Sequence, residues 1–203
     1  MSDAALTPRA RRTGASGGAG RRWRLALIAG AVLVACGLLV WWQGAQSAAA
    51  RARDGRVLCA ALLADLEATV PGSGPAAEQA PEDLPVIELE GVQVAGRLSG
   101  LEAPVDLPVA ALGEDASLTP ALEEGAGGEL VVRVPSWLAG ESGIDALEPG
   151  NRLTFVQVNG ARRSFSVVDR GTTRAAFNDS YDLLIYVRGA YGEKDWVGCS
   201  QFS

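Results

Sequence analysis

An uncharged stretch near the N-terminus constrains this chain more than any other feature. Leu25 to Trp42 is eighteen residues long and carries no charged side chain. At about 1.5 Å per residue, a helix of that length nearly crosses the hydrocarbon core of a bilayer. Trp23, Trp41 and Trp42 fall at its two ends, where indole rings prefer the membrane interfaces. The sequence therefore predicts a transmembrane helix over residues 25–43, with the membrane as a partner through Leu25–Trp42.

Arginines around this stretch predict its orientation. Residues 1–24 contain six arginines and one acidic residue, Asp3, among glycine, alanine and serine. We expect this segment to be a basic cytoplasmic tail without a packed structure. A nucleic-acid-binding arm is the alternative, but membrane orientation accounts better for the arginines. The prediction is a single-pass plasma-membrane protein with a cytoplasmic N-terminus and an extracellular C-terminal domain.

Small residues follow the apolar stretch, so a cleaved signal peptide is a further alternative. Ala45–Ala49 would supply the cleavage site. The apolar stretch is longer than the core of a usual signal peptide, and this favours a retained anchor.

A second helix is predicted over residues 44–70. Leu58, Ala61, Leu62 and Leu66 recur at spacings of three and four, as on one face of a helix. Such a helix is either a stalk that continues from the membrane or a helix that packs against the following domain. Gly55 weakens its first half. Residues 71–83, which begin with a Pro- and Gly-rich run, are predicted to be a linker.

From Leu84 the pattern becomes that of β-strands. Apolar residues alternate with polar ones from Val86 to Leu98, with Gly91 as a turn or bulge. Further strands are predicted around residues 130–134, 153–158 and 165–168. Asn159-Gly160 is a strong hairpin signal, because both residues tolerate positive φ. Gly113 to Gly128 is acidic and Gly-rich and is predicted to be a loop.

Several motifs occur in an order that resembles a known family. Gly143–Asn151 holds a Leu-x-Pro-Gly-Asn turn after an apolar strand, Asp106–Val109 reads Asp-Leu-Pro-Val, and Asp182–Arg188 is a late apolar strand. This order resembles the sortases, membrane-anchored cysteine transpeptidases of Gram-positive bacteria, and most of all their class B branch. The resemblance covers residues 84–203. It implies a mainly β domain, a closed barrel of seven or eight strands, preceded by the transmembrane helix and the helical stalk.

The resemblance also implies where catalytic residues would stand. A sortase needs a cysteine thiolate, a histidine and an arginine. The histidine position falls on Pro135, the cysteine position on Arg188, and the arginine position on or near Lys194. The sequence contains no histidine at all. We therefore expect no catalytic residues and interpret the chain as a degenerate member, a pseudo-sortase.

A different alignment would make Cys199 the nucleophile. It leaves only four residues after the cysteine, too few for the strand that should carry the arginine. Cys59 and Cys199 would both lie outside the cell, where a disulfide between them and two free thiols are equally compatible with the sequence. Metal binding is disfavoured, because there is no histidine and the cysteines are far apart. No cofactor-binding motif is present.

Arg188, Lys194 and Trp137 are the candidate ligand-binding residues. The two cations would leave the cleft positively charged, although both would also be ordinary as solvated surface charges. Residues 84–203 contain nine basic and seventeen acidic residues, which argues against nucleic acid as a partner.

The leading functional hypothesis is a non-catalytic binding, scaffolding or regulatory module in surface-protein or pilus assembly. Its partners would be an active sortase, a sorting-signal peptide or a pilin. The alternatives are an active transpeptidase that uses Cys199 and a stalked structural spacer.

Overall fold

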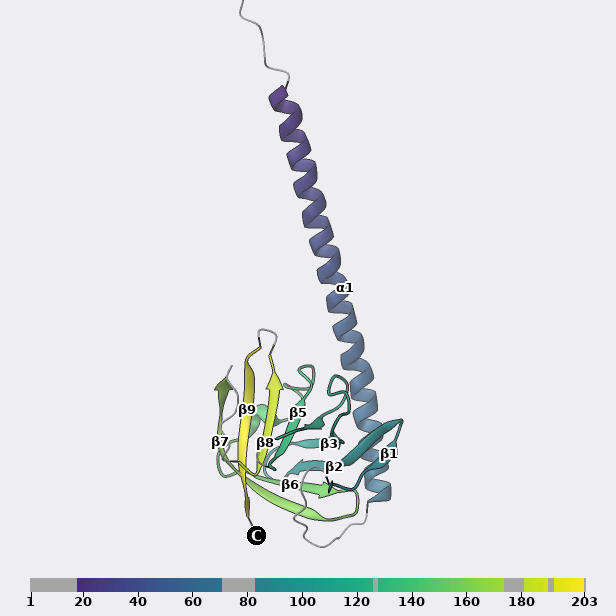
Figure 1. Ribbon diagram of the computed structural model, residues 1–203, viewed down its shortest axis with the longest axis vertical. Helices are drawn as coiled ribbons and strands as arrows, with labels where there is room; N and C mark the ends of the chain where they lie inside the picture. The colour runs from purple at the N-terminus through teal and green to yellow at the C-terminus, as the bar shows by residue number, and fades with distance from the viewer. Residues whose placement is uncertain (1–17, 71–82, 126–127, 174–180, 190–191, 203) are drawn as a thin grey trace, which may run out of the picture. The chain divides into compact units, whose positions relative to one another are not determined.

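The computed structural model describes residues 18–70, 83–125, 128–173, 181–189 and 192–202 (Figure 1). The chain divides into two compact units, Met1–Ser47 and Ala48–Ser203. All but the last residue of the predicted linker, residues 71–83, and most of the predicted cytoplasmic tail, residues 1–24, lie outside the described residues.

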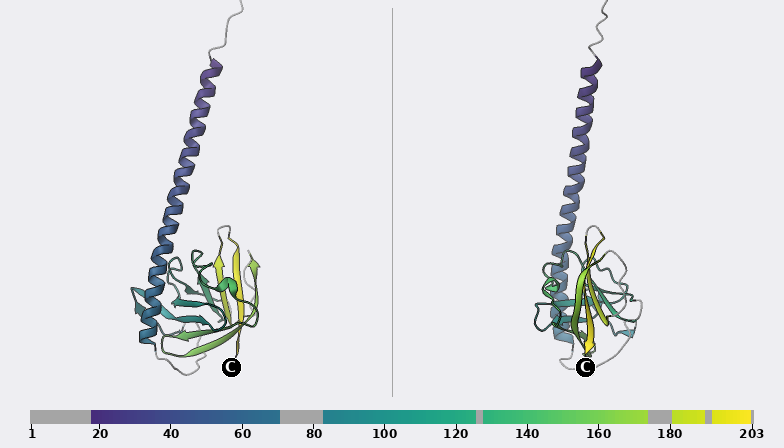
Figure 2. Two further views of the ribbon diagram at one scale, coloured as in Figure 1. Left: turned by 180° about the vertical axis from the view of Figure 1, so that it is seen from behind. Right: turned by 90° about the vertical axis from the view of Figure 1, so that its left-hand side faces the viewer.

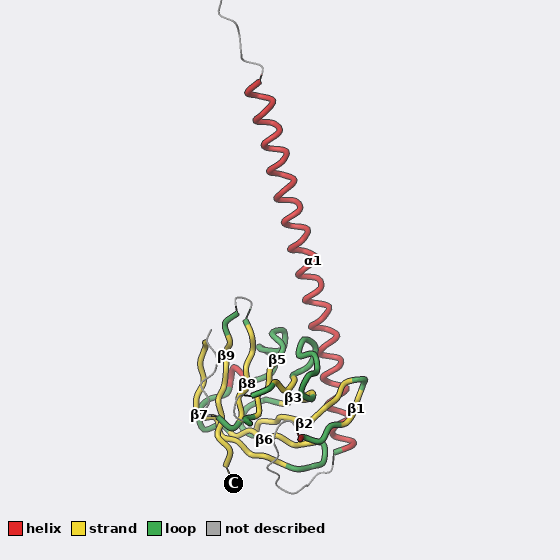
Figure 3. Tube along the Cα trace, in the orientation of Figure 1, coloured by secondary structure: helices red, strands yellow, loops and turns green. Residues whose placement is uncertain are grey.

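One continuous helix, α1 (Gly18–Thr69), contains both predicted helices (Figure 3). It begins inside the segment that was predicted to be a tail. Its apolar part is long and apolar enough to cross a membrane. The side chains described from Leu27 to Ala50 are exposed. This is the pattern expected of a helix whose apolar surface is covered by lipid instead of protein.

The last turns of α1, within the unit Ala48–Ser203, pack against the β domain. Leu62 and Leu66 are buried against Val94 and Val158. The structure combines the two arrangements that the spacing of leucines allowed, because the helix continues from the apolar stretch and its last turns pack against the β domain. The predicted periodicity therefore corresponds to a real contact face.

The β domain is a closed barrel. Its strands are β1 (Ile87–Leu89), β2 (Val92–Gly100), β3 (Asp106–Ala110), β4 (Ala121–Glu123), β5 (Leu130–Val134), β6 (Arg152–Gln157), β7 (Arg162–Thr173), β8 (Leu183–Arg188) and β9 (Lys194–Phe202). The strand order is β1-β2-β3-β4-β5-β8-β9-β7-β6, and β6 pairs with β2. The eight strands β2 to β9 thus form the ring, and β1 pairs with the start of β2. This confirms the predicted closed barrel (Figure 2).

The barrel interior is filled by every second residue of its strands. Val132 and Val134 of β5 and Ile185 and Val187 of β8 point inward and are buried, together with Phe155 and other apolar residues of the main core. Because side chains alternate along a strand, the residues between them face outward. This alternation decides which side chains are available to a site on the outer surface.

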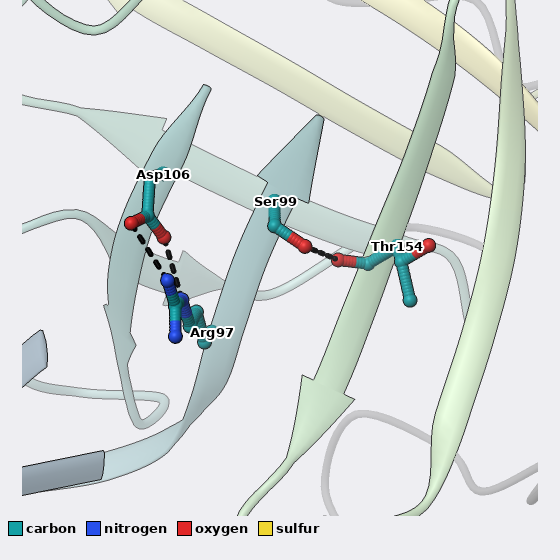
Figure 4. Close-up of polar contacts among 4 residues, drawn as sticks. All are labelled: Arg97, Ser99, Asp106 and Thr154. Atoms are coloured by element: carbon teal, nitrogen blue, oxygen red, sulfur yellow. Dashed lines mark hydrogen bonds and ion pairs between the residues drawn. The ribbon is translucent and has the colours of Figure 1, made fainter. Parts of the chain in front are cut away.

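Side-chain contacts on both sides of β2 reinforce the closure (Figure 4). Toward β3, Arg97 donates Nε and Nη2 to the two carboxylate oxygens of Asp106, at 2.6 and 2.8 Å. Toward β6, the hydroxyl of Ser99 donates to the carbonyl oxygen of Thr154 at 3.4 Å. A bidentate arginine–carboxylate pair fixes the orientation of its two strands better than a single hydrogen bond does.

The predicted turns are present. Gly160 has φ 85° in the turn between β6 and β7, while the side chain of Asn159 accepts a hydrogen bond from the backbone of Ala161 at 3.0 Å. Gly150 has φ 99° after Pro149. A 3₁₀ turn, η2 (Ile144–Ala146), precedes this Pro-Gly turn.

One prediction was wrong. The segment Gly113–Gly128 was predicted to be a loop throughout, but it contains β4. The strand has only three residues, Ala-Leu-Glu, which are too few to show alternation and are poor strand formers. Pairing with Val131, Val132 and Arg133 of β5 makes them a strand.

Candidate functional site

A cleft of about 440 Å³ lies where β5 and β8 end, within the unit Ala48–Ser203. Its walls come from α1, from the loop before β4, from β5 and the turn after it, and from the end of β8. The lining residues are Ala48, Arg51, Ala116, Ser117, Arg133, Val134, Pro135, Ser136, Trp137, Arg188 and Gly189. The structure thus brings together Pro135, Trp137 and Arg188, three of the five candidate site residues, and leaves Lys194 and Cys199 outside the lining.

Parallel pairing of β5 and β8 explains why these positions meet. Arg133 lies opposite Tyr186, and Val134 lies opposite Val187. The valines face the core, so Arg133, Tyr186 and Arg188 lie on the outer face. Pro135 follows β5 directly and Arg188 is the last residue of β8, so the two strand ends form one edge of the cleft.

Arg188 contributes an exposed positive charge to this edge. Its side chain makes no hydrogen bond or ion pair with any residue that the structure describes. A guanidinium remains protonated at all physiological pH values and has five donors, so it can bind a carboxylate but cannot attack a carbonyl carbon.

A partly buried network lies beside the cleft. The hydroxyl of Tyr186 donates to one carboxylate oxygen of Glu123, and Nη1 of Arg133 donates to the other at 3.3 Å. Burial, and then the bond to Glu123, raise the pKa of Tyr186 to about 12. Tyr186 therefore stays a neutral donor, and Glu123 is held in place between the tyrosine and the arginine.

The contacts of Trp137 are mainly structural. Its indole Nε1 donates to the carbonyl oxygen of Ser117 at 2.9 Å, and its ring lies against Gly55 of α1. Nearby, Nε and Nη2 of Arg56 donate to the two carboxylate oxygens of Glu141, each at 2.7 Å. These contacts attach α1 to the turn after β5 and make the helix a wall of the cleft.

Lys194 does not line the cleft. It is the first residue of β9 and lies opposite Arg188 in the β8–β9 pairing. Its Nζ lies 5.1 Å from the centre of the Tyr186 ring, within the range of a cation–π contact. Lys194 thus lies on the same outer face as Arg188 but outside the cleft.

Cys199, the nucleophile of the rival alignment, is fully buried in the barrel core among residues such as Leu183 and Val197. Burial raises the pKa of its thiol to about 12. Cys59 is also buried, and burial raises its pKa as well. All three cysteines are free, so the structure has no disulfide between Cys59 and Cys199.

The described residues contain no group of three or more cysteine, aspartate or glutamate side chains placed to hold a metal ion.

Sequence reasoning missed Arg51, Arg133, Glu123 and Tyr186. The outward position of Arg133 could have been predicted, because it is the one charged residue in the apolar run Leu130–Val134. Alternation along the strand places it on the face opposite to Val132 and Val134. Arg51 was considered only as a charge flanking the membrane span. Glu123 lies in the segment that was predicted to be a loop, so its strand neighbours were not foreseeable.

Comparison with known proteins finds similar structures but no similar sequence. The sequence matches no protein-family profile and no curated protein sequence. The structure resembles solved sortases. A Clostridium perfringens sortase C with the C-terminal cell wall sorting motif is 17% identical, with 75% of this chain and 89% of that chain covered and a TM-score of 0.46.

Two further structures match at the same level. A lid mutant of Streptococcus agalactiae sortase C1 is 14% identical, with 76% and 89% covered and a TM-score of 0.46. A Clostridium perfringens sortase D5 transpeptidase is 12% identical, with 58% and 83% covered and a TM-score of 0.44. Each of these structures is similar to this chain at low identity, and the activity of the chain is argued from its own residues.

Proposed function

We propose that this chain is a membrane-anchored, non-catalytic binding module that presents a sortase-like barrel at the outer face of the plasma membrane. One observation carries the proposal. The cleft at the ends of β5 and β8 holds Pro135 and Arg188 at the positions that the resemblance assigns to the catalytic histidine and cysteine. Neither residue can perform the chemistry of the group it replaces.

The rest of the chain offers no substitute of the usual kind. There is no histidine in the sequence to act as general acid or base. Cys199 lies in the core with a raised pKa, away from the lining of the cleft. A thiol attacks as a thiolate, and one with a pKa of about 12 is almost entirely protonated at neutral pH.

Binding needs less than catalysis, and the features that support it are retained. The cleft has a volume suited to a few side chains of a partner, and it is lined by cations beside apolar surface. Arg188 has no described ion-pair partner of its own. The partner classes that we propose are a sorting-signal peptide, a pilin and an active sortase.

A combined turnover and binding assay tests the proposal. The full-length protein in detergent micelles is incubated with a fluorogenic library of LPxTG-type peptides, and cleavage and fluorescence anisotropy are followed together. We expect no cleavage, and binding that weakens several-fold in Arg188→Ala. Arg152→Ala, an exposed arginine away from the cleft, is the matched control and should bind normally.

The other outcomes are equally informative. Turnover that disappears in Cys199→Ala would replace the proposal by an active transpeptidase. No turnover together with binding that is indifferent to Arg188 would favour the stalked spacer.

A further inference from the structure

Three guanidinium groups line the cleft, and each comes from a different element. Arg51 projects from α1, Arg133 from β5 and Arg188 from the end of β8. No acidic residue is among the lining residues. Positive charges concentrated in a concave site attract an anionic group, because low-dielectric walls strengthen the field inside it.

We propose that the cleft is a carboxylate-binding site completed by α1, and that its ligand is an acidic group on an extended peptide. The inference rests on the proposed binding function and specifies the chemistry of the ligand. Arginine suits this role because its planar fork matches the two oxygens of a carboxylate.

Arg133 already interacts with a carboxylate in the structure. Its Nη1 lies 3.3 Å from Oε1 of Glu123, a long contact that leaves other donors of the guanidinium available. The hydroxyl of Tyr186 holds the other oxygen of Glu123. Glu123 thus helps to orient the side chain of Arg133 at the cleft.

The charge of Glu123 also limits what the cleft accepts. Glu123 places a carboxylate beside the arginines, so the cleft presents less positive charge to a ligand than the arginines alone would. A second charge on the ligand, as on phosphate, meets repulsion from Glu123. The arrangement therefore favours a carboxylate over a phosphate group.

Apolar surface beside the arginines indicates a peptide. The half-buried ring of Trp137 lines the cleft together with Ala48 and Pro135. An acidic residue followed or preceded by an apolar side chain would satisfy both surfaces. A free anion would use the arginines alone.

The helix is part of the site because its attachment positions Arg51. The ring of Trp137 against Gly55 and the pair between Arg56 and Glu141 hold this part of α1 to the turn after β5. Arg51 lies one helical turn before these contacts. Its neighbour Arg53 is exposed on the same helix but does not line the cleft, which offers a matched control.

Four peptide pools test the assignment on the full-length protein in phosphatidylcholine nanodiscs. The pools carry glutamate or glutamine at one fixed position and end in a free carboxylate or an amide, so that the two sources of a carboxylate are separated. We expect a pool with a carboxylate to bind roughly tenfold more tightly than its neutral counterpart. Arg51→Gln and Arg133→Gln should each remove most of that difference, and Arg53→Gln should leave it unchanged.

Inorganic phosphate provides a second measurement. It should compete weakly with the acidic peptide on the wild-type protein and several-fold better on Glu123→Gln. Binding that depends on Arg188 but ignores both the peptide charge and Arg51 would overturn the carboxylate site and leave the proposed binding function intact. Binding to nanodiscs that contain phosphatidylglycerol, in place of the acidic peptides, would overturn it in favour of a lipid headgroup.

Discussion

The indole ring of Trp137 occupies the space that any side chain at Gly55 would need. A Cβ atom built on Gly55 would lie 2.3 Å from Cζ2 of Trp137 and 2.8 Å from the carbonyl oxygen of Leu118. Glycine weakens an isolated helix, so its presence at this position needs another explanation. The close approach of α1 to the turn after β5 supplies one.

Replacing Gly55 should therefore loosen the helix. In an exposed helix Gly→Ala gains about 1 kcal/mol, but here overpacking against Trp137 should cost about 1–3 kcal/mol. The buried thiol of Cys59, one turn further along α1, reports the contact. We expect faster reaction of Cys59 with a thiol reagent in Gly55→Ala. Gly44→Ala, where nothing lies within 4 Å, should behave as wild type.

Gln157 is a candidate for stabilisation. It is fully buried, and neither its Oε1 nor its Nε2 has a hydrogen-bond partner among the described residues. A buried amide without partners costs free energy, so Gln157→Met should raise the free energy of unfolding by about 1 kcal/mol. Urea unfolding measures this. Gln201→Met, which removes the acceptor of the Arg163 Nε bond at 3.0 Å, should not stabilise the protein.

Stability should fall in alkaline solution. Burial raises the pKa of Cys199 from 9.0 to about 12 and that of Tyr186 from 10.0 to about 12. Between these values the unfolded chain releases the protons and the folded barrel keeps them, so the free energy of unfolding falls as the pH rises. Each group contributes a slope of up to about 1.4 kcal/mol per pH unit.

Denaturation at a series of pH values checks this dependence. Cys199→Ala and Tyr186→Phe should each show a shallower decline above pH 9 than the wild type. A decline of unchanged slope in both variants would mean that other groups control it.

The orientation in the membrane has its own test. Ala5→Cys adds one thiol to the predicted cytoplasmic tail, and Leu112→Cys adds one thiol to an exposed turn of the barrel domain. On intact cells an impermeant maleimide should label Leu112→Cys and not Ala5→Cys, with the unmodified chain as background. The opposite pattern would reverse the predicted topology.

The barrel was predictable because its signals are local. The apolar run Leu130–Val134 and the glycines at positions 150 and 160 act over a few residues, and the structure has a strand and turns there. The cleft was predictable only in part. Pro135 and Arg188 came from the resemblance, and the parallel register of β5 and β8 brings them to one edge.

The remaining cleft residues depend on contacts between distant parts of the chain. Arg51 joins the site through the packing of α1 at Gly55, and Glu123 joins it through the pairing of β4 with β5. Neither contact leaves a periodic pattern in the sequence. The unsatisfied amide of Gln157 was likewise invisible, since burial of a single polar residue follows from tertiary packing alone.

The seam between β3 and β4 has a consequence for local opening. A single register pair, Ala110 with Ala121, joins these strands, whereas β7 and β9 are paired over nearly their whole length. Amide protons at this seam should exchange with solvent well before those of β7 and β9, because fewer bonds must break together. The loop across the seam carries Ala116 and Ser117 of the cleft. We therefore expect the barrel to open first at this seam, on the side of the cleft, while the long pairing of β7 with β9 stays closed.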